Sequence, residues 1–285
     1  MAASSMITLK NREDTMNSAT VEIDVLQMKP FEALQEWNRT LIKKVSEQMD
    51  LIERMSRLKR YLSPQLIDSI LNSDDPDPIK SHRRDITAIF LDLRGFTAFS
   101  DGAEPEEVMA VLRTYHTEMG KLIFKFGGTV EHFAGDGLMV FFNDPVPCDD
   151  HTEKAVRLSL EMRNRAKELR TGWLQKGYDL DLGIGLAAGY AAVGNIGFEG
   201  QMDYGAVGNV TNLASRLCGA AKGGQILTDQ KTLALIENLV DVEPLQELYL
   251  KGLVRPVRAF DIVSLRRHEE ITESRRDEAA DLQAR

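Results

Sequence analysis

Two aspartates stand where a carboxylate is unusual. Asp92 interrupts the apolar strand end of "IFLDLRGFT", and Asp136 lies between two glycines in "EHFAGDGLMVFF". Taken alone, each has an ordinary explanation: Asp-Gly between strands is a strong hairpin signal, and Asp92 could cap the turn that follows it. However, a carboxylate that emerges from a core strand is costly without a cationic partner. The pair therefore suggests a site that holds cations.

A second motif follows Asp92 at once. In "RGFT", residues 94–97, a glycine ends a strand just before a helical turn, so several backbone N–H groups point in one direction. Such a cradle binds phosphate. Paired carboxylates beside phosphate donors are what two Mg²⁺ ions on a nucleoside triphosphate require, because Mg²⁺ prefers oxygen ligands from a few carboxylates and from substrate phosphates.

The elements that must position these motifs alternate in a regular order. The patterning predicts a strand, a helix, two strands, a helix and a strand, in "DITAIFLDL", "PEEVMAVLRTYHTEMGKLIFKF", "GGTVEHF", "LMVFF", residues 151–176 and residues 179–188. This βαββαβ order is the ferredoxin-like α+β core. Its first strand and its second and third strands are adjacent and central, so we expect Asp92 and Asp136 to converge at one edge of the sheet.

A C-terminal extension follows this core. We expect a helix at "NVTNLASRLCGAA", a strand at "QILTD" and a strand pair around "ELYLKGLVRPVRAFDIV". The tail at 266–285 is highly charged and is expected to be a solvated helix or disordered.

The chain before the core is organised differently. Residues 1–30 are polar and expected to be flexible, with "VEIDV" as a possible short strand. Residues 31–78 read as a coiled-coil helix and linker, because a heptad pattern of mostly apolar residues runs from Leu34 to Leu62. Asn38 and Lys59 occupy a-type positions of this repeat, and polar a positions favour two strands. We expect a parallel dimeric coiled coil; the alternative is an amphipathic helix packed on its own domain.

Composition excludes several classes of function. The 285 residues carry a net charge of −9, which disfavours nucleic-acid binding. No apolar run approaches the roughly 18 residues of a membrane span, and the polar N-terminus does not resemble a signal peptide. Cys148 and Cys218 lie far apart and are expected to be reduced thiols, so we expect a cytoplasmic protein.

Three motifs in this order and spacing resemble the catalytic domain of class III nucleotide cyclases: "FLDLRGFT", "GGTVEHFAGDGLMVFF" and "VGNVTNLASRL". The resemblance runs from about Asp85 to Val263, within an expected catalytic domain at 79–265. It implies a homodimer with active sites at the interface, which converts a nucleoside triphosphate to a 3′,5′-cyclic monophosphate and pyrophosphate with two Mg²⁺ or Mn²⁺ ions. The coiled coil is similar to signalling linkers of the family, so an upstream sensor domain or protein is expected.

The resemblance also implies roles for single residues. Asp92, Asp136 and the carbonyl of Leu93 would bind metal. The amides of the phosphate loop would hold the β- and γ-phosphates; this loop comprises Gly95, Phe96 and Thr97. Sequence shows no dedicated protein base, so water, a substrate phosphate or Asp92 would take the proton of the ribose hydroxyl.

Three further residues match family positions outside this loop. Asn212 would orient the ribose and Arg216 would neutralise the α-phosphate, both acting from the other subunit; their i, i+4 spacing places them on one helix face. Lys251 would contact the triphosphate tail. Without the resemblance, Arg216 would be an ordinary partner of a nearby acid and Lys251 a solvated charge at a strand end.

The base-selecting positions depart from the family pattern. Family adenylate cyclases have lysine at His132 and aspartate, threonine or serine at Gly205, and the glutamate and cysteine of guanylate cyclases are absent too. His132 could be an inert strand residue, and Asp203 could replace Gly205. We favour ATP as the substrate; the alternatives are GTP, another base, or a degenerate module that binds nucleotide without turnover. The chain keeps the residues that match the metal, ribose and phosphate positions of the family, which argues against a degenerate module.

Overall fold

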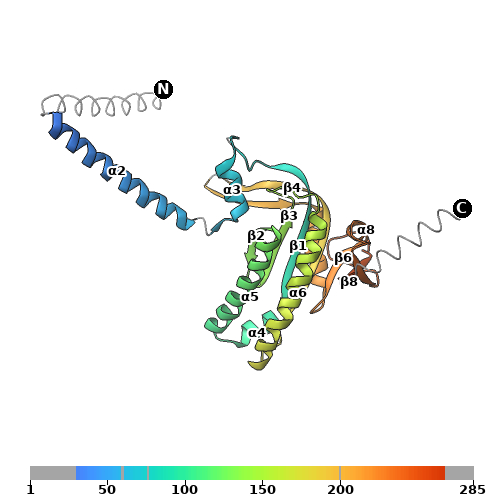
Figure 1. Cartoon of the computed structure of the whole chain (residues 1–285). Coiled ribbons are helices and arrows are strands. Elements are labelled where there is room, and N and C mark those ends of the chain that lie inside the picture. The colour runs from blue at the N-terminus through green and yellow to red at the C-terminus, as the bar shows by residue number, and fades with distance from the viewer. Residues whose placement is uncertain (1–29, 59–60, 76, 199, 267–285) are drawn as a thin grey trace, which may run out of the picture. The chain divides into compact units, whose positions relative to one another are not determined.

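The computed structural model describes residues 30–58, 61–75, 77–198 and 200–266, and the chain divides into two compact units, residues 1–62 and 63–285 (Figure 1). Three parts of the sequence predictions lie outside the described residues: the expected flexible segment with "VEIDV", position Lys59 of the heptad repeat, and the charged tail after Arg266.

The first unit contains helix α2, Pro30–Leu58. Four apolar residues of the heptad repeat are 41–62% exposed on this helix: Leu34, Leu41, Val45 and Ile52. Its polar surface carries short-range ion pairs such as Glu36–Arg39 and Lys43–Glu47, which add little stability at such exposure. An exposed apolar seam on a long helix is what a coiled coil requires, and pairing of this helix stays a prediction.

The second unit begins with α3, Pro64–Asn72, which matches the turn and short helix expected at "LSPQLIDSILNS". Ser63 caps it by accepting a hydrogen bond from the Leu66 N–H at 3.3 Å, and Pro64 occupies the first turn. Leu66 is buried, and Gln65 donates to the Gly128 carbonyl at 3.1 Å. These contacts fix the helix on the domain that follows it.

One mixed sheet organises this unit. Its strands are β1 His82–Arg94, β2 Thr129–Ala134, β3 Gly137–Phe142, β4 Asp181–Phe198, β5 Gln201–Val207, β6 Ile226–Asp229, β7 Val240–Pro244 and β8 Ala259–Leu265. The strand order is β2-β3-β1-β4-β6-β8-β7, and β5 pairs with β4. The helices are α4 Phe96–Gly102, α5 Pro105–Phe126, α6 His151–Gln175, α7 Asn209–Ala220 and α8 Gln230–Ala234. The α+β class and the βαββαβ core predicted from sequence are confirmed.

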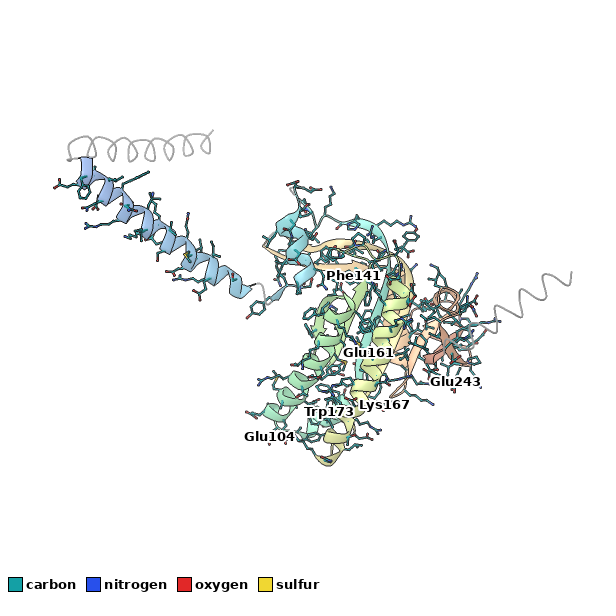
Figure 2. All side chains as sticks on the ribbon, viewed as in Figure 1. Glu104, Phe141, Glu161, Lys167, Trp173 and Glu243 are labelled. Atoms are coloured by element: carbon teal, nitrogen blue, oxygen red, sulfur yellow. The ribbon has the colours of Figure 1, made fainter. Side chains whose placement is uncertain are left out.

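Helices α5 and α6 run side by side over the sheet (Figure 1). Figure 2 shows Glu104, just before α5, and Trp173, near the end of α6, at the same end of this antiparallel pair. Pro105 and a capping box between Glu104 and Glu107 start α5, and Gly127 ends it with φ 75°. The largest hydrophobic cluster lies between these helices and the sheet, and α7 packs against β4 and β1 in a second cluster.

Two sequence predictions need correction. The strand expected at 179–188 is β4, Asp181–Phe198, and it continues into a hairpin with β5 that was not predicted. Its glycine-rich second half, "AAVGNIG", lacks the apolar alternation that signals a strand. The expected C-terminal pair was also wrong in its partner: β8 pairs with β7, while "ELYL" contributes only the bridge Leu248–Val257. A turn at Gly252 and the missing N–H of Pro256 limit pairing there.

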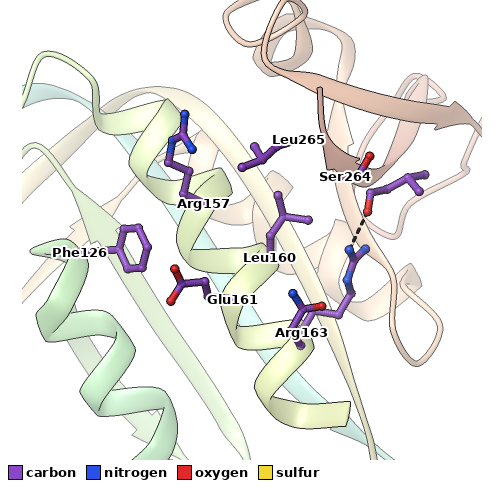
Figure 3. A pocket seen from close by; sticks show the side chains of 9 residues that line it. Phe126, Arg157, Leu160, Glu161, Arg163, Ser264 and Leu265 are labelled. Carbon is purple, nitrogen blue, oxygen red and sulfur yellow. Dashed lines mark hydrogen bonds between the residues drawn. The ribbon is translucent and has the colours of Figure 1, made fainter. Parts of the chain in front are cut away.

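Arg163 fastens β8 to α6. Its guanidinium donates to the carbonyls of Ile262 at 3.0 Å and Val263 at 2.6 Å, beside a hollow of about 510 Å³ (Figure 3). The hollow is lined by Phe126, Arg157, Leu160, Glu161, Arg163, Asn164, Val263, Ser264 and Leu265. None of these residues is among the site residues predicted from the sequence. Among the described residues, no helix is long and apolar enough to cross a membrane.

Candidate active site

Asp92 lies at the end of the central strand β1, opposite Gly183 of β4. Its side chain is 43% exposed, and its Oδ2 is 2.9 Å from Nη2 of Arg94. Burial, and next the charge of Asp136, raise the pKa of Asp92 to about 6, while Arg94 opposes this shift. The positive charge of Arg94 therefore only partly balances the negative charge at Asp92 and Asp136.

Asp136 lies at the tip of the β2–β3 hairpin, where Gly135 adopts φ 63°. Its Oδ2 accepts a hydrogen bond from the Leu93 N–H at 2.9 Å, which ties the tip of the hairpin to the end of β1. The register Leu91–Leu138 between β1 and β3 brings these two ends together. Asp136 is thus a turn residue whose carboxylate is also held beside Asp92, as the strand order predicted.

The phosphate loop follows directly. Gly95 adopts φ 84° as the N-cap of α4, and a Cβ there would lie 2.5 Å from the Asp179 carbonyl oxygen. Only glycine fits this position without displacing backbone. Phe96 and Thr97 form the first turn of α4, where backbone N–H groups lack partners within the helix. A hollow of about 360 Å³ borders this turn and is lined by Gly95, Ala98, Phe99, Gly102, Ala103, Glu107, Gly177, Tyr178 and Asp179.

Arg94 is a residue of this site to which the sequence analysis gave no role. Besides its ion pair with Asp92, its Nη2 donates to the Cys218 carbonyl at 3.1 Å, near the end of α7. Burial raises the pKa of the Cys218 thiol to about 12, so the neighbouring sulfur stays neutral. The signal was present in "DLRGFT": a carboxylate at the end of a core strand needs a cation, and Arg94 is the nearest in sequence.

Asn212 and Arg216 lie one turn apart on α7 and are both exposed. The opposite face of the helix packs through buried residues such as Val210, Ala214 and Leu217. In the described part of the chain, neither the Asn212 nor the Arg216 side chain makes a hydrogen bond or an ion pair. A single copy of the chain therefore does not join them to Asp92 and Asp136.

Lys251 lies in the turn between β7 and β8 and is exposed. The residues beside it, Tyr249 and Val254, are 87% and 101% exposed. Like Asn212 and Arg216, Lys251 presents a free polar group to solvent rather than to the acid pair of its own chain.

The two positions predicted to select the base lie on strands that approach each other, β2 and β5. The His132 side chain is 57% exposed, and its Nδ1 is 3.5 Å from Oε2 of Glu131. Gly205 pairs with Gly194 of β4. Glu131, which the sequence analysis did not consider, lies between the two positions: its Oε1 accepts a hydrogen bond from the Ala206 N–H at 3.0 Å.

Comparison with known proteins agrees with this arrangement. The family model of the adenylate and guanylate cyclase catalytic domain matches residues 79–264. Adenylate cyclase 1 of Rhizobium meliloti is 29% identical over 217 residues, 75% of this chain and 33% of that protein. The crystal structure of the adenylyl cyclase CyaB from P. aeruginosa is 37% identical, with a TM-score of 0.63 over 66% of this chain and 98% of the other. That of the guanylyl cyclase Cya2 is 36% identical, with a TM-score of 0.62 over 66% and 96%.

The chain belongs to the family of adenylate and guanylate cyclase catalytic domains, since the family match at residues 79–264 covers more than half of the chain and includes the three motifs that carry the resemblance. The resemblance inferred from the three sequence motifs is confirmed. The chain spans about a third of the length of the curated relatives it matches.

Members of this family use divalent metal ions, and the acid pair suits them. Asp92 and Asp136 supply oxygen ligands, which hard cations prefer. Burial, and next the charge of Asp136, raise the pKa of Asp92, and a bound cation would favour its charged form. Among the described residues no group of three or more acidic, histidine or cysteine side chains could hold a metal, so phosphate or carbonyl oxygens would have to complete the coordination.

Proposed function

We propose that the chain is an adenylate cyclase, which converts ATP to 3′,5′-cyclic AMP and pyrophosphate at the interface of a homodimer. The observation that carries the proposal is the acid pair: Asp92 and Asp136 are held together at the end of β1, directly beside the Gly95 turn. Carboxylates for cations next to backbone donors for phosphate suit a substrate that is a metal-bound triphosphate.

Each residue has a distinct task in this proposal. Asp92, Asp136 and the Leu93 carbonyl hold two Mg²⁺ or Mn²⁺ ions, which when bound supply Lewis acidity and neutralise the triphosphate. The phosphate loop donates hydrogen bonds to the β- and γ-phosphates. The ribose 3′-oxygen then attacks the α-phosphorus in line with the departing pyrophosphate, so positioning and charge stabilisation carry the catalysis.

The second copy of the chain supplies the remaining groups. Asn212 orients the ribose, Arg216 donates to the α-phosphate as charge develops there, and Lys251 binds the triphosphate tail. The proposal rests on the exposure of all three side chains, none of which makes a hydrogen bond or ion pair with the acid pair in the described part of one chain. It also explains apolar side chains on the β4–β5 hairpin that are 41–69% exposed: Ile196, Phe198, Met202 and Val207. Pairing of the α2 seams in a parallel coiled coil would reinforce the dimer and connect it to an upstream sensor.

ATP is proposed because the curated relatives with 29–30% identity are named adenylate cyclases. GTP is the second candidate, since the guanylyl cyclase Cya2 is as similar to this chain as the adenylyl cyclase CyaB. A cytoplasmic site of action fits either nucleotide, because both are abundant there.

The test offers ATP, GTP, CTP and UTP separately to the full chain, with Mg²⁺ and with Mn²⁺, and identifies the products. We expect 3′,5′-cyclic AMP and equimolar pyrophosphate, formed fastest from ATP. Cyclisation of GTP in preference to ATP would overturn the choice of base. Binding of a nucleotide without release of pyrophosphate under any condition would overturn the enzyme assignment in favour of a binding module.

A further inference from the structure

We propose that Glu131 reads the base: its carboxylate fills the position that Gly205 leaves open and accepts a hydrogen bond from the 6-amino group of adenine. This inference rests on the proposed adenylate cyclase activity and assigns the specificity to a residue outside the two family positions, His132 and Gly205. It follows from the path of β2, from the space around Gly205 and from the chemistry of a carboxylate.

The path of β2 directs Glu131 toward β5. The register between β2 and β3 shifts between Val130 and His132, so Glu131 has no partner residue in β3. An extra residue of this kind redirects a side chain from the regular alternation of a strand, and such irregularities are common beside active sites. Here the redirected side chain reaches across to the Ala206 N–H of β5, at 3.0 Å.

The space at Gly205 is already occupied by this side chain. A Cβ on Gly205 would lie 2.1 Å from Glu131 Oε1 and 3.0 Å from the Ile196 Cδ1 atom. Real side chains do not approach so closely, so position 205 cannot carry a side chain while Glu131 keeps its place. Position 205 departs from the family pattern because it is a glycine, and this glycine leaves the space that the Glu131 side chain fills. The polar group at this place therefore comes from β2 instead of β5.

Glu131 is an unusual residue in energetic terms. Its side chain is only 12% exposed, and Nδ1 of the His132 ring lies 3.5 Å from its Oε2. Burial raises the pKa of Glu131, and the hydrogen bond from Ala206 opposes that shift. Holding an acid in such a place costs stability, and one neutral N–H offsets only part of the cost. A carboxylate has about four acceptor sites, so it can accept from a base and from Ala206 together.

A carboxylate placed beside position 6 of the ring distinguishes the two purines. It only accepts hydrogen bonds, and adenine presents its N6 amino donor where guanine presents the O6 acceptor. An acceptor facing an acceptor leaves both groups without a hydrogen bond. A mismatch of this kind costs one to two decades of specificity, on the order of the 1–3 kcal/mol of an unsatisfied buried group.

The experiment measures kcat/KM for ATP, GTP and ITP with the full chain carrying Glu131→Gln. The glutamine oxygen can still accept from Ala206 N–H, while its amide can donate to O6. We expect the ATP/GTP and ATP/ITP ratios to fall by about tenfold or more. Glu106→Gln, an exposed glutamate in the first turn of α5, is the matched control and should leave both ratios unchanged.

A second variant tests the same assignment through Gly205. Gly205→Ala should displace the Glu131 side chain and lower the ATP/GTP ratio in the same direction, and in a Glu131→Ala background it should have little further effect, because the two positions share one space. Unchanged ratios in active Glu131→Gln protein would overturn the inference and leave Glu131 as a structural tie to β5. A ratio that moves toward ATP would overturn it too, by assigning the carboxylate to guanine donors. Absence of cyclisation in the unmodified chain would refute the proposed function instead, so the two failures are distinguishable.

Discussion

An aspartate lies close to basic and polar groups at each end of strand β1, but its charge is compensated to a different extent at the two ends. At one end, near His82, the Asp144 side chain is 4% exposed, and His82 Nε2 lies 2.7 Å from its Oδ2. Tyr204 donates its hydroxyl to the other carboxylate oxygen, and Arg84 Nε is 3.7 Å away. At the other end, Asp92 is partly exposed beside a second carboxylate, and within the described part of the chain its one ion pair is with Arg94.

This difference separates a structural carboxylate from one available for chemistry. Asp144 has a partner for each oxygen, and it links β1, the end of β3 and β5 inside the domain. The acid pair has one arginine for two carboxylates, which leaves negative charge for a cation to neutralise. The comparison teaches that incomplete charge compensation, rather than burial alone, distinguishes the end of the sheet at which we propose the active site.

The largest expected effect tests whether residues of a second chain complete the site at the acid pair. Asp144 differs in this respect, because its partners lie in its own chain. Asp92→Ala and Arg216→Ala should each lower the cyclase rate by roughly a thousandfold, because each removes charge stabilisation of the reaction. Mixed in equal amounts and allowed to exchange, the two inactive proteins should recover roughly a quarter of the wild-type rate. Half of the dimers are then mixed, and each mixed dimer has one complete site. Chains that demonstrably exchange and stay inactive would rule out the shared site.

The next effect in size tests the structural end. Asp144→Ala should lower the free energy of unfolding by about 2–4 kcal/mol, because it leaves Tyr204, His82 and Arg84 without their common partner. Urea unfolding followed by circular dichroism measures this change. Asp92→Ala is the comparison, and we expect it to change stability by less than about 1 kcal/mol. Equal losses in both variants would remove the distinction between the two ends.

The smallest effect is a pH dependence at His82. The hydrogen bond to the Lys80 carbonyl, and then Asp144, raise the pKa of His82 in the folded chain. The stabilisation is therefore complete below the unfolded pKa of about 6.5 and is lost as pH rises through the higher folded value. His82→Gln should reduce the decline of stability between about pH 6 and 8, by less than about 1 kcal/mol since the ring is 39% exposed. An identical pH profile in the variant would show that His82 carries no proton-linked stability.

The sequence was sufficient to predict the core and the meeting of the acid pair. Regular periodicity located β1, α5 and α6, and the strand order then required Asp92 and Asp136 to converge. These predictions depend on patterns that extend over many residues, which is where sequence signals are strongest.

Features that depend on local backbone irregularity could not be predicted. The register shift at Glu131 follows no periodic signal, and neither does the glycine-rich hairpin of β4 and β5. The sequence analysis gave Asp144 no role, because its partners His82 and Tyr204 lie about 60 residues away in either direction. Long-range polar contacts of this kind appear only when the sheet is assembled.

The most direct test of the account measures cyclic AMP formation and unfolding free energy on the same preparations of wild type and Asp136→Asn. Asparagine keeps an acceptor for the Leu93 N–H but removes the charge that the acid pair needs, and Asp149→Ala, at an exposed turn position, is the control. The account predicts a rate lowered by roughly a hundredfold or more, with stability unchanged within about 1 kcal/mol. Near-normal turnover in folded Asp136→Asn protein would contradict it.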